Sequence, residues 1–473
     1  MPPNRREFIA TALAASAIAA APRLSQAQTK QPNILFILAD DLGYGDLSCY
    51  GRPDYQTPNL DKLAAQGVRF ANAYSAAPLC TPTRCGFITG RYPARTRIGL
   101  EEPLTEKGAL GEQAKVLGLP AEHPTIASLL KQSGYHTALI GKWHLGYLPN
   151  FGPIQSGFEE FFGIMSGAAD FFTHKDMGGD LDLYEGKVPV ERIGYTTEML
   201  TQRAVEYVSK RRSSPFYLSL HYTAPHWPWE AAGDRPPNPE LRGPVAFRAG
   251  GSLKTYAAMM KSLDDGIGEV LRALDRTGLT NSTLVIFTSD NGGERFSYNW
   301  PFRGEKGGLW EGGIRVPAIV RLPRDVRSVS RRVGTATGSR SSSQSLPPGG
   351  RIIQQEAITM DWTATILAAA GARPDPNYPL DGIDLLPAIH QSRHPTPDTR
   401  HLFWRTSTQD AALHGRWKYV RDGENEYLFD LSVDEREQAN FREQNPSMFN
   451  QLKDEFKKWD ATLLPRPAPR RRS

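Results

Sequence analysis

The chain has 473 residues, of which 39% are hydrophobic, and its formal net charge at pH 7 is +5. A chain of this size and composition buries a large core, and we expect one big domain followed by a smaller one. The modest net charge argues against a nucleic-acid-binding protein. Much of the excess positive charge lies in segment 321–351 and in the tail 466–473, and such tails are usually solvated ends.

The first residues have the pattern of an export signal. Arg5 and Arg6 precede an apolar run at 10–21, and small residues at 25–27 suit a signal peptidase. The arginine pair resembles a twin-arginine signal, and the alternative is an ordinary secretory signal with the same destination. No other run approaches the roughly 20 apolar residues of a membrane span. We therefore predict an export signal at 1–27, the Tat export machinery as a partner, and a periplasmic or secreted mature chain without a membrane span.

Apolar strands and amphipathic helices alternate along the chain. Segment 32–39 is an unbroken apolar run, typical of a parallel strand buried on both faces, and a helix is expected from Thr57 to Gly67 before an extended piece at 68–70. Further helices are predicted at 124–130 and 256–274, and further strands at 137–140, 216–220 and 284–288. This order predicts an α/β fold with a large, mainly parallel sheet sandwiched between helices, whose ligands gather at the carboxyl ends of the strands.

The composition changes near the C-terminal end. Segment 328–350 is rich in Ser, Gly, Arg and Pro, and we interpret it as an exposed, flexible insertion. A strand and a helix are expected within 352–370, followed by a connector at 381–387. Short strands at 402–404, 417–420 and 427–429 and a helix at 448–459 predict a small antiparallel sheet with a terminal helix. We place a large domain at 28–387, a small C-terminal subdomain at 388–465 and a basic tail at 466–473.

Two of the predicted strands end in pairs of oxygen-bearing side chains. Asp40 and Asp41 follow the first strand, and Asp290 and Asn291 follow the strand at 284–288. Taken singly, such a pair is more often a turn or a helix cap. Two pairs directly after apolar strands favour a cation site, and ligands of this kind suit a hard ion such as Ca²⁺ or Mg²⁺.

The segment 80–84 reads Cys-Thr-Pro-Thr-Arg and predicts an anion site. Pro82 suits the first turn of a helix, which places Cys80 at the helix N-terminus, and the four-residue spacing puts Arg84 on the same face. A helix N-terminus beside a guanidinium binds tetrahedral oxyanions such as sulfate or phosphate. The alternative is a buried cysteine in a loop-to-helix turn. Setting Cys80 aside leaves Cys49 and Cys85 as the one candidate disulfide, and spacing does not decide whether they pair.

Segment 80–84, together with Thr-Gly-Arg at 89–91, resembles the signature of the type I (formylglycine-dependent) sulfatase family, whose arylsulfatase-like members belong to the alkaline phosphatase superfamily. The resemblance extends from about residue 33 to residue 440, and it includes segments 40–46, 134–144, 222–226, 289–293 and 303–317. It implies that a formylglycine-generating enzyme oxidises Cys80 to formylglycine, and that residues 28–387 form the catalytic domain.

The family's functional residues map onto this sequence at matching positions. The resemblance implies a Ca²⁺ or Mg²⁺ site formed by Asp40, Asp41, Asp290, Asn291 and the formylglycine at Cys80. It implies that Lys142 and Lys306 bind sulfate and that Arg84 neutralises its charge. One hydroxyl of the hydrated aldehyde would attack sulfur while His226 protonates the leaving group, and the second hydroxyl would then lose its proton to His144 and expel sulfate. Lys142 and His144, two residues apart in an extended segment, are expected to point the same way.

Several other residues near the signatures are candidates for substrate contacts. Ser166 lies in a stretch that does not align cleanly with the sulfate-binding serine of some family members. Trp227 and Trp229 flank Pro228 beside His226 and either stack on a ring of the substrate or pack the loop. Three more polar residues near the signatures are candidates for reading substrate hydroxyls: Asp170, His174 and His221.

Three functions are compatible with these patterns. The sequence favours hydrolysis of a sulfate ester, either an aryl sulfate or a sulfated sugar. A second interpretation is a phosphatase or phosphonate monoesterase of the same superfamily, because phosphate and sulfate share their shape. A third is a catalytically silent protein that binds sulfated glycans, against which the complete segment 80–84 and both acidic pairs argue.

Overall fold

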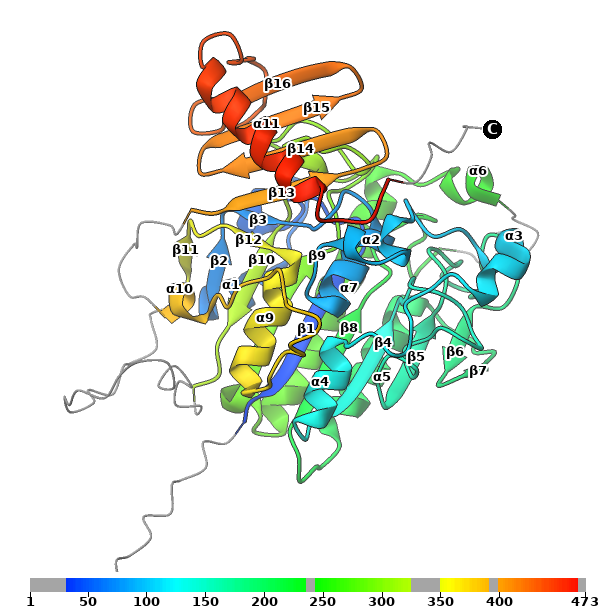
Figure 1. Ribbon diagram of the computed structural model, residues 1–473. Coiled ribbons are helices and arrows are strands. Elements are labelled where there is room, and N and C mark those ends of the chain that lie inside the picture. The colour runs from blue at the N-terminus through cyan, green and yellow to red at the C-terminus, as the bar shows by residue number, and fades with distance from the viewer. Residues whose placement is uncertain (1–30, 235–242, 325–348, 391–398, 467–473) are drawn as a thin grey trace, which may run out of the picture. The chain divides into compact units, whose positions relative to one another are not determined.

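A ten-stranded sheet forms the centre of the protein (Figure 1). The computed structural model describes residues 31–234, 243–324, 349–390 and 399–466, so the predicted export signal, nearly all of the predicted insertion and all but one residue of the basic tail lie outside the described residues. In spatial order the strands are β11 (Arg351–Ile353), β2 (Val68–Phe70), β10 (Ala318–Arg321), β9 (Thr283–Ser289), β1 (Asn33–Ala39), β8 (Phe216–His221), β4 (His136–Gly141), β5 (Glu160–Ile164), β6 (Leu183–Glu185) and β7 (Val188–Pro189).

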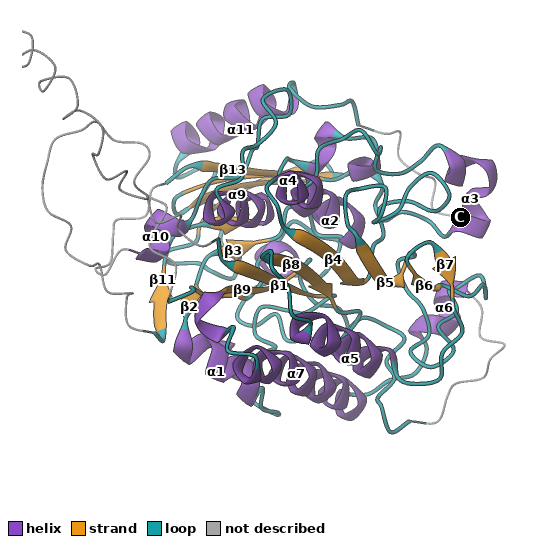
Figure 2. Cartoon of the chain, turned by 90° about the horizontal axis from the view of Figure 1, so that it is seen from below, coloured by secondary structure: helices purple, strands orange, loops and turns teal. Residues whose placement is uncertain are grey.

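The central strands of this sheet, β9, β1, β8, β4 and β5, are parallel to one another. β10 pairs antiparallel with β9 and β2, and β6 pairs antiparallel with β5 and β7. The prediction of a mainly parallel sheet is confirmed. Because parallel strands need crossover connections, both faces of the sheet are covered by helices (Figure 2).

The two faces of β1 are buried in two separate hydrophobic clusters, as expected from the alternation of side chains along a strand. Phe36 packs in a cluster with α2 (Cys80–Thr89), α4 (Ile126–Gln132) and α9 (Thr359–Ala370). Ile37 packs in the other cluster, with α1 (Pro58–Gln66), α5 (Thr196–Ser209) and α7 (Leu253–Arg276). The unbroken apolar sequence of β1 therefore reflects burial on both faces. Four short helices complete the framework: α3 (Lys107–Leu110), α6 (Gly243–Arg248), α8 (Glu311–Ile314) and α10 (Leu386–His390).

The C-terminal residues form a four-stranded antiparallel sheet and a terminal helix, as predicted. Its strands, in spatial order, are β13 (His401–Arg405), β14 (Gln409–His414), β15 (Trp417–Asp422) and β16 (Asn425–Asp430), and α11 (Pro446–Asp460) packs on β14 and β15. The sequence did not predict β14, whose small apolar residues carry little strand signal. A two-stranded sheet pairs β3 (Ala73–Tyr74) with β12 (Ala357–Ile358).

The structure decides the cysteine pairing that spacing left open. All three cysteines are free, so Cys49 and Cys85 do not pair, and Cys85 Sγ instead lies 2.9 Å from Thr96 Oγ1 in the core. Among the described residues, no helix has the length and apolar character that a membrane crossing requires.

Candidate active site

Both acidic pairs lie at the carboxyl ends of neighbouring parallel strands. β1 and β9 pair in register up to Ala39 and Ser289, so the residues that follow these strands meet at one edge of the sheet. Asp41 N donates a hydrogen bond to Asp290 Oδ1 at 3.1 Å, and Asn291 Nδ2 donates one to Asp41 Oδ1 at 2.7 Å. All four acidic-pair side chains are buried. The predicted convergence of the two pairs is therefore present in the structure.

Cys80 is the first residue of α2 and faces these carboxylates. Its Sγ lies 3.5 Å from Asp40 Oδ1 and 3.9 Å from Asp41 Oδ1. Burial raises the pKa of the Cys80 thiol well above its ordinary value, although Lys142 and Lys306 act in the opposite direction. The unmodified cysteine is therefore a poor thiolate nucleophile, which fits a residue that serves as a precursor.

Arg84 lies one helical turn further along α2 and is fully buried. Its Nε and Nη2 both donate to Asp290 Oδ2, at 3.1 and 2.8 Å, and its Nη1 donates to the carbonyl oxygen of Lys142 at 3.1 Å. Burial opposes ionisation of Asp290, yet Arg84 and Lys142 hold the pKa of this carboxyl at about 2. The guanidinium is therefore fixed in place by an ionised partner, as its predicted role requires.

Two lysines enter the site from different loops and pair with the first acidic pair. Lys142 Nζ lies 2.6 Å from Asp40 Oδ2, and Lys306 Nζ lies 2.6 Å from Asp41 Oδ2. Burial and the neighbouring Asp290 raise the pKa of Asp40 to about 7, although Lys142 opposes this shift. Three buried carboxyl groups thus face two buried cationic groups, Arg84 and Lys142, and the partly buried Lys306, so a divalent cation added here would leave an excess of positive charge for an anionic substrate.

His144 departs from the geometry expected of it. It has a positive φ of 59°, and Gly141 at the end of β4 has a φ of 116°, so segment 141–144 is not a regular extended strand. Lys142 Nζ reaches Asp40, whereas His144 Nε2 lies 3.0 Å from the carbonyl oxygen of Leu104. The expected extended backbone is therefore not present at His144, although the charges of Lys142 and Arg84 act on its ring and the two side chains belong to the same site. The other ring nitrogen, Nδ1, is buried and has no hydrogen-bond partner within the described ranges.

His226 lies beside the first acidic pair. Its Nε2 is 3.6 Å from Asp41 Oδ2, and its Nδ1 is 2.5 Å from the carbonyl oxygen of Trp227. Since a carbonyl oxygen only accepts, Nδ1 carries the ring proton and Nε2 is the nitrogen that faces the site. Burial, Lys306 and Lys142 lower the pKa of His226 well below its ordinary value of 6.5. The neutral imidazole is thus the resting form.

The residues at this edge of the sheet fit a hard divalent cation. Ligand atoms of Asp40, Asp41, Cys80 and His226 all lie within 4.8 Å of one another. Asn291 Oδ1 is buried and accepts no hydrogen bond from any described residue, which is costly for an amide oxygen unless something else occupies it. Carboxylate and amide oxygens are the ligands that Ca²⁺ and Mg²⁺ prefer. The cluster of carboxylates at this edge is therefore compatible with a bound divalent cation.

Other predicted residues are tied into the surrounding structure. Ser166 Oγ donates to Asp182 Oδ2 at 2.5 Å, and His174 Nε2 lies 3.1 Å from the carbonyl oxygen of Gly194. Asp170 Oδ1 accepts hydrogen bonds from the backbone of the turn that follows it. His221 lies behind the guanidinium of Arg84, with its Nδ1 3.4 Å from Arg84 Nη1. Both of its ring nitrogens have protein partners, since Nε2 lies 2.8 Å from Ser219 Oγ and Nδ1 lies 3.2 Å from the carbonyl oxygen of Lys142, so it is not placed to read a substrate hydroxyl.

The two tryptophans beside His226 pack the loop. Trp227 is 6% exposed and Trp229 is 7% exposed, so neither ring offers a free stacking face of any size. The guanidinium carbon of Arg248 lies 4.9 Å from the ring centroid of Trp227, and Phe296 packs edge-on against Trp229. Of the two interpretations of this pair, the structure favours loop packing.

Sequence reasoning missed one residue of the site. Glu294 follows the segment 289–293 directly, and its Oε2 lies 3.5 Å from Lys306 Nζ. The same oxygen accepts a hydrogen bond from Trp227 Nε1 at 3.1 Å. Its position immediately after Gly293 was the only available signal, because a single glutamate in a loop is otherwise an ordinary surface residue.

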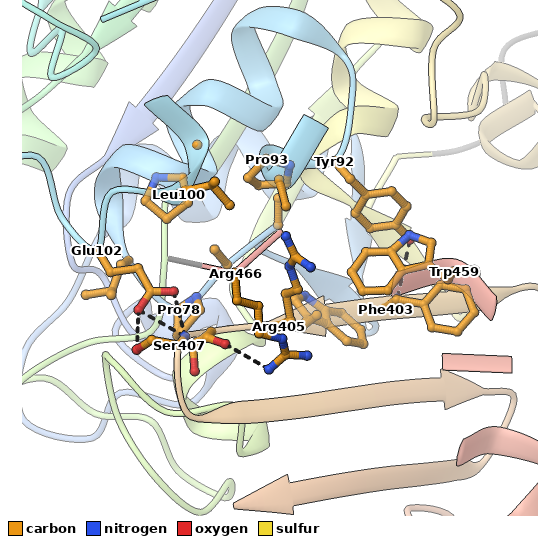
Figure 3. Close-up of a pocket in the computed structure, with 18 residues that line it drawn as sticks. Pro78, Tyr92, Pro93, Leu100, Glu102, Phe403, Arg405, Ser407, Trp459 and Arg466 are labelled. Atoms are coloured by element: carbon orange, nitrogen blue, oxygen red, sulfur yellow. Dashed lines mark hydrogen bonds between the residues drawn. The ribbon is translucent and has the colours of Figure 1, made fainter. Parts of the chain in front are cut away.

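A separate pocket lies between the loop that precedes α2 and the C-terminal sheet (Figure 3). Its charged side chains are already paired with protein groups: Glu102 accepts hydrogen bonds from the backbone N and Oγ of Ser407, and Arg466 Nη2 lies 2.5 Å from Asp410 Oδ1. Arg405 pairs with Asp460 in the same way. Among the described residues that line this pocket, every charged side chain is therefore already paired within the protein.

Comparison with known proteins agrees with the site. The sulfatase family model matches residues 32–372. The chain is 33% identical to arylsulfatase J of Mus musculus over 429 residues, covering 84% of this chain and 66% of that protein. It is 32% identical to N-acetylgalactosamine-6-sulfatase of Homo sapiens over 417 residues, covering 83% of this chain and 73% of that protein.

The fold is similar to that of a solved crystal structure. The crystal structure of Ps i-CgsB superposes with a TM-score of 0.77 at 28% identity, and the match covers 93% of this chain and 95% of that one. A second crystal structure of that protein, in complex with k-i-k-neocarrahexaose, superposes with a TM-score of 0.76. The chain belongs to the sulfatase family, a class of sulfuric ester hydrolases.

Proposed function

We propose that this protein hydrolyses the sulfate ester of an aryl or sugar leaving group, using formylglycine made from Cys80 and a bound Ca²⁺, with Mg²⁺ as the alternative cation. The observation that supports this most strongly is the convergence of Cys80, both acidic pairs, Arg84, Lys142 and Lys306 at one edge of the sheet. A formylglycine-generating enzyme is accordingly a partner of the chain.

The cation would be held by Asp40, Asp41, Asp290, Asn291 and the modified residue 80. When bound, it supplies positive charge that lowers the pKa of a nucleophilic hydroxyl and neutralises the sulfuryl oxygens. Formylglycine at residue 80, once hydrated, would supply two hydroxyl groups, one as the nucleophile for sulfur and one whose deprotonation would release sulfate.

The side chains of the site divide the remaining work between them. Arg84 stays locked to Asp290 and orients the anion, while Lys142 and Lys306 exchange their carboxylate partners for sulfuryl oxygens as negative charge develops there. His226 presents Nε2 to the leaving oxygen and acts as the general acid once it is protonated. His144 Nδ1 has no hydrogen-bond partner among the described residues, and it takes the proton that the release of sulfate requires.

The names of the relatives support a substrate class, and the N-terminal sequence pattern supports a cellular location. Relatives named for aryl and N-acetylgalactosamine 6-sulfates, and a structural neighbour that binds a neocarrahexaose, support a ring-bearing leaving group. The twin-arginine pattern at the N-terminus supports export through the Tat machinery to the periplasm or the medium.

Mass spectrometry of the peptide that contains residue 80, from protein made in its native host, tests this proposal. We expect the aldehyde in place of the thiol, and turnover of a sulfate ester that scales with the converted fraction. Cys80→Ser offers one hydroxyl in place of two, so it should show no multiple turnover. An unconverted Cys80 in protein from its own host would instead favour a silent sulfated-glycan-binding protein.

A further inference from the structure

Glu294 is a partly exposed carboxylate at the rim of the candidate active site, with 24% of its side chain accessible. One of its oxygens, Oε2, is held by Lys306 Nζ at 3.5 Å and by Trp227 Nε1 at 3.1 Å. The other oxygen, Oε1, receives no hydrogen bond from the residues that the structure describes. The contacts at Oε2 fix the carboxylate in place and leave Oε1 available to a substrate.

Its contacts place Glu294 on the side from which the organic part of the ester leaves. Trp227 follows His226, and the centroids of the two rings are 4.2 Å apart. His226 is the proposed proton donor to the leaving oxygen, and Lys306 is a proposed sulfate ligand. Glu294 contacts Lys306 directly and contacts Trp227, the neighbour of His226. A substituent next to the scissile ester would therefore meet the carboxylate of Glu294.

We propose that Glu294 is a specificity-determining residue that selects neutral, hydroxyl-bearing leaving groups and disfavours those with a second anionic group beside the scissile ester. This inference rests on the proposed sulfatase function and names its substrate class. A carboxylate only accepts hydrogen bonds, so a hydroxyl can pair with Oε1, whereas a second sulfate or carboxylate is repelled. Repulsion between two like charges about 6 Å apart lowers the binding constant of the second anion. The decrease is between about 3-fold and about 100-fold, depending on the effective dielectric constant.

Two aryl sulfates that differ in one ortho substituent, hydroxymethyl or carboxylate, provide the test. We would measure kcat/KM for both with Ca²⁺-supplied protein whose Cys80 is confirmed as aldehyde. The variant is Glu294→Gln, which keeps the shape and an acceptor for Trp227 but removes the charge. The matched control is Glu305→Gln, which removes an exposed carboxylate next to Lys306 in the chain.

We expect the wild type to prefer the hydroxymethyl ester, and Glu294→Gln to reduce that preference about tenfold by accelerating the carboxylate ester. The control should keep the wild-type preference. An unchanged preference in Glu294→Gln, or an equal slowing of both esters, would overturn the proposal, because a purely structural role affects both esters alike.

Binding of inorganic sulfate, measured by calorimetry, separates this inference from the function on which it rests. We expect Glu294→Gln to bind sulfate several-fold more tightly than the wild type and the control, because a like charge has been removed. If the wild type turns over neither ester, the proposed function fails for aryl substrates. An unchanged or weaker sulfate affinity in Glu294→Gln would refute the charge role of Glu294 in either case.

Discussion

Lys142 and Asp40 form a fully buried ion pair, with Nζ 2.6 Å from Oδ2. A buried carboxylate of this kind is stable only with a partner, and here the partners are the lysine, Arg84 Nη2 at 3.6 Å from Asp40 Oδ1 and, in the loaded enzyme, the proposed cation. The lysine balances the charge of Asp40, and we propose that it also receives a sulfuryl oxygen.

Replacing this lysine should impair both roles. We expect Lys142→Ala to lower kcat/KM for a sulfate ester by about 10²- to 10³-fold, the range seen when one preorganised charge-stabilising group is removed. Steady-state kinetics with the metal-supplied enzyme measures this. Lys131→Ala, which removes an exposed lysine, should retain full activity; a variant at position 142 that is equally active would refute the assigned role.

The role of His226 depends on the leaving group. His226→Ala should slow hydrolysis of a sugar sulfate by about 10²- to 10⁴-fold, but that of a nitrophenyl sulfate far less, since a good leaving group needs no proton. Burial, Lys306 and Lys142 lower the pKa of His226 well below 6.5. The protonated form that acts as the general acid is therefore lost already at low pH, and kcat for the sugar ester should fall as pH rises. Comparing both esters over pH measures this, and His390→Ala serves as the control.

Metal removal should destabilise the protein as well as inactivate it. Three buried carboxyl groups lose their cation on chelation, and any ligand that binds only the folded state stabilises it by about 2.7 kcal/mol at 100 times its Kd. Thermal unfolding should therefore shift to lower temperature with chelator and return with added Ca²⁺. Asp40→Asn should abolish most of the calcium-dependent shift, and a full shift in that variant would exclude Asp40 as a ligand.

A second buried charge cluster joins the C-terminal sheet to the loop that carries Lys306. Lys418 Nζ on β15 lies 2.8 Å from Glu311 Oε1 and 2.8 Å from Glu437 Oε1. Lys418→Met leaves the buried Glu437 without its cation and Glu311 with Arg315 alone, whose Nη1 lies 3.0 Å from Glu311 Oε2, so it should lower the free energy of unfolding by about 3–5 kcal/mol. Denaturant titration measures this loss. The exposed Lys457→Met should cost little, and an equally small loss at Lys418 would contradict the assignment.

Glu230 should make stability depend on pH. Burial and the neighbouring Asp170 raise its pKa from 4.5 to about 8, so the folded state holds a proton that the unfolded state has released between these values. Stability should therefore fall as pH rises from 5 to 8, by at most about 1.4 kcal/mol per pH unit. Glu230→Gln should flatten that slope in thermal unfolding, whereas the exposed Glu191→Gln should leave it unchanged.

Much of this architecture was predictable from local sequence patterns. The apolar run of β1 predicted a strand buried on both faces, and the acids that follow β1 and β9 meet because adjacent parallel strands end at one edge. Other features depend on tertiary contacts that no local pattern encodes. The backbone at His144 turns into a positive φ next to β5, and Glu294 gains its meaning only from contacts with Trp227 and Lys306.

The most direct test of the central claim compares one aryl leaving group presented as its sulfate and as its phosphate. The enzyme must have its Cys80 confirmed as aldehyde and be supplied with Ca²⁺. We predict a strong preference for the sulfate, because the sulfatase family model and the curated sulfatase relatives cover most of this chain. A preference for the phosphate would contradict the account and indicate a phosphatase or phosphonate monoesterase of the same superfamily.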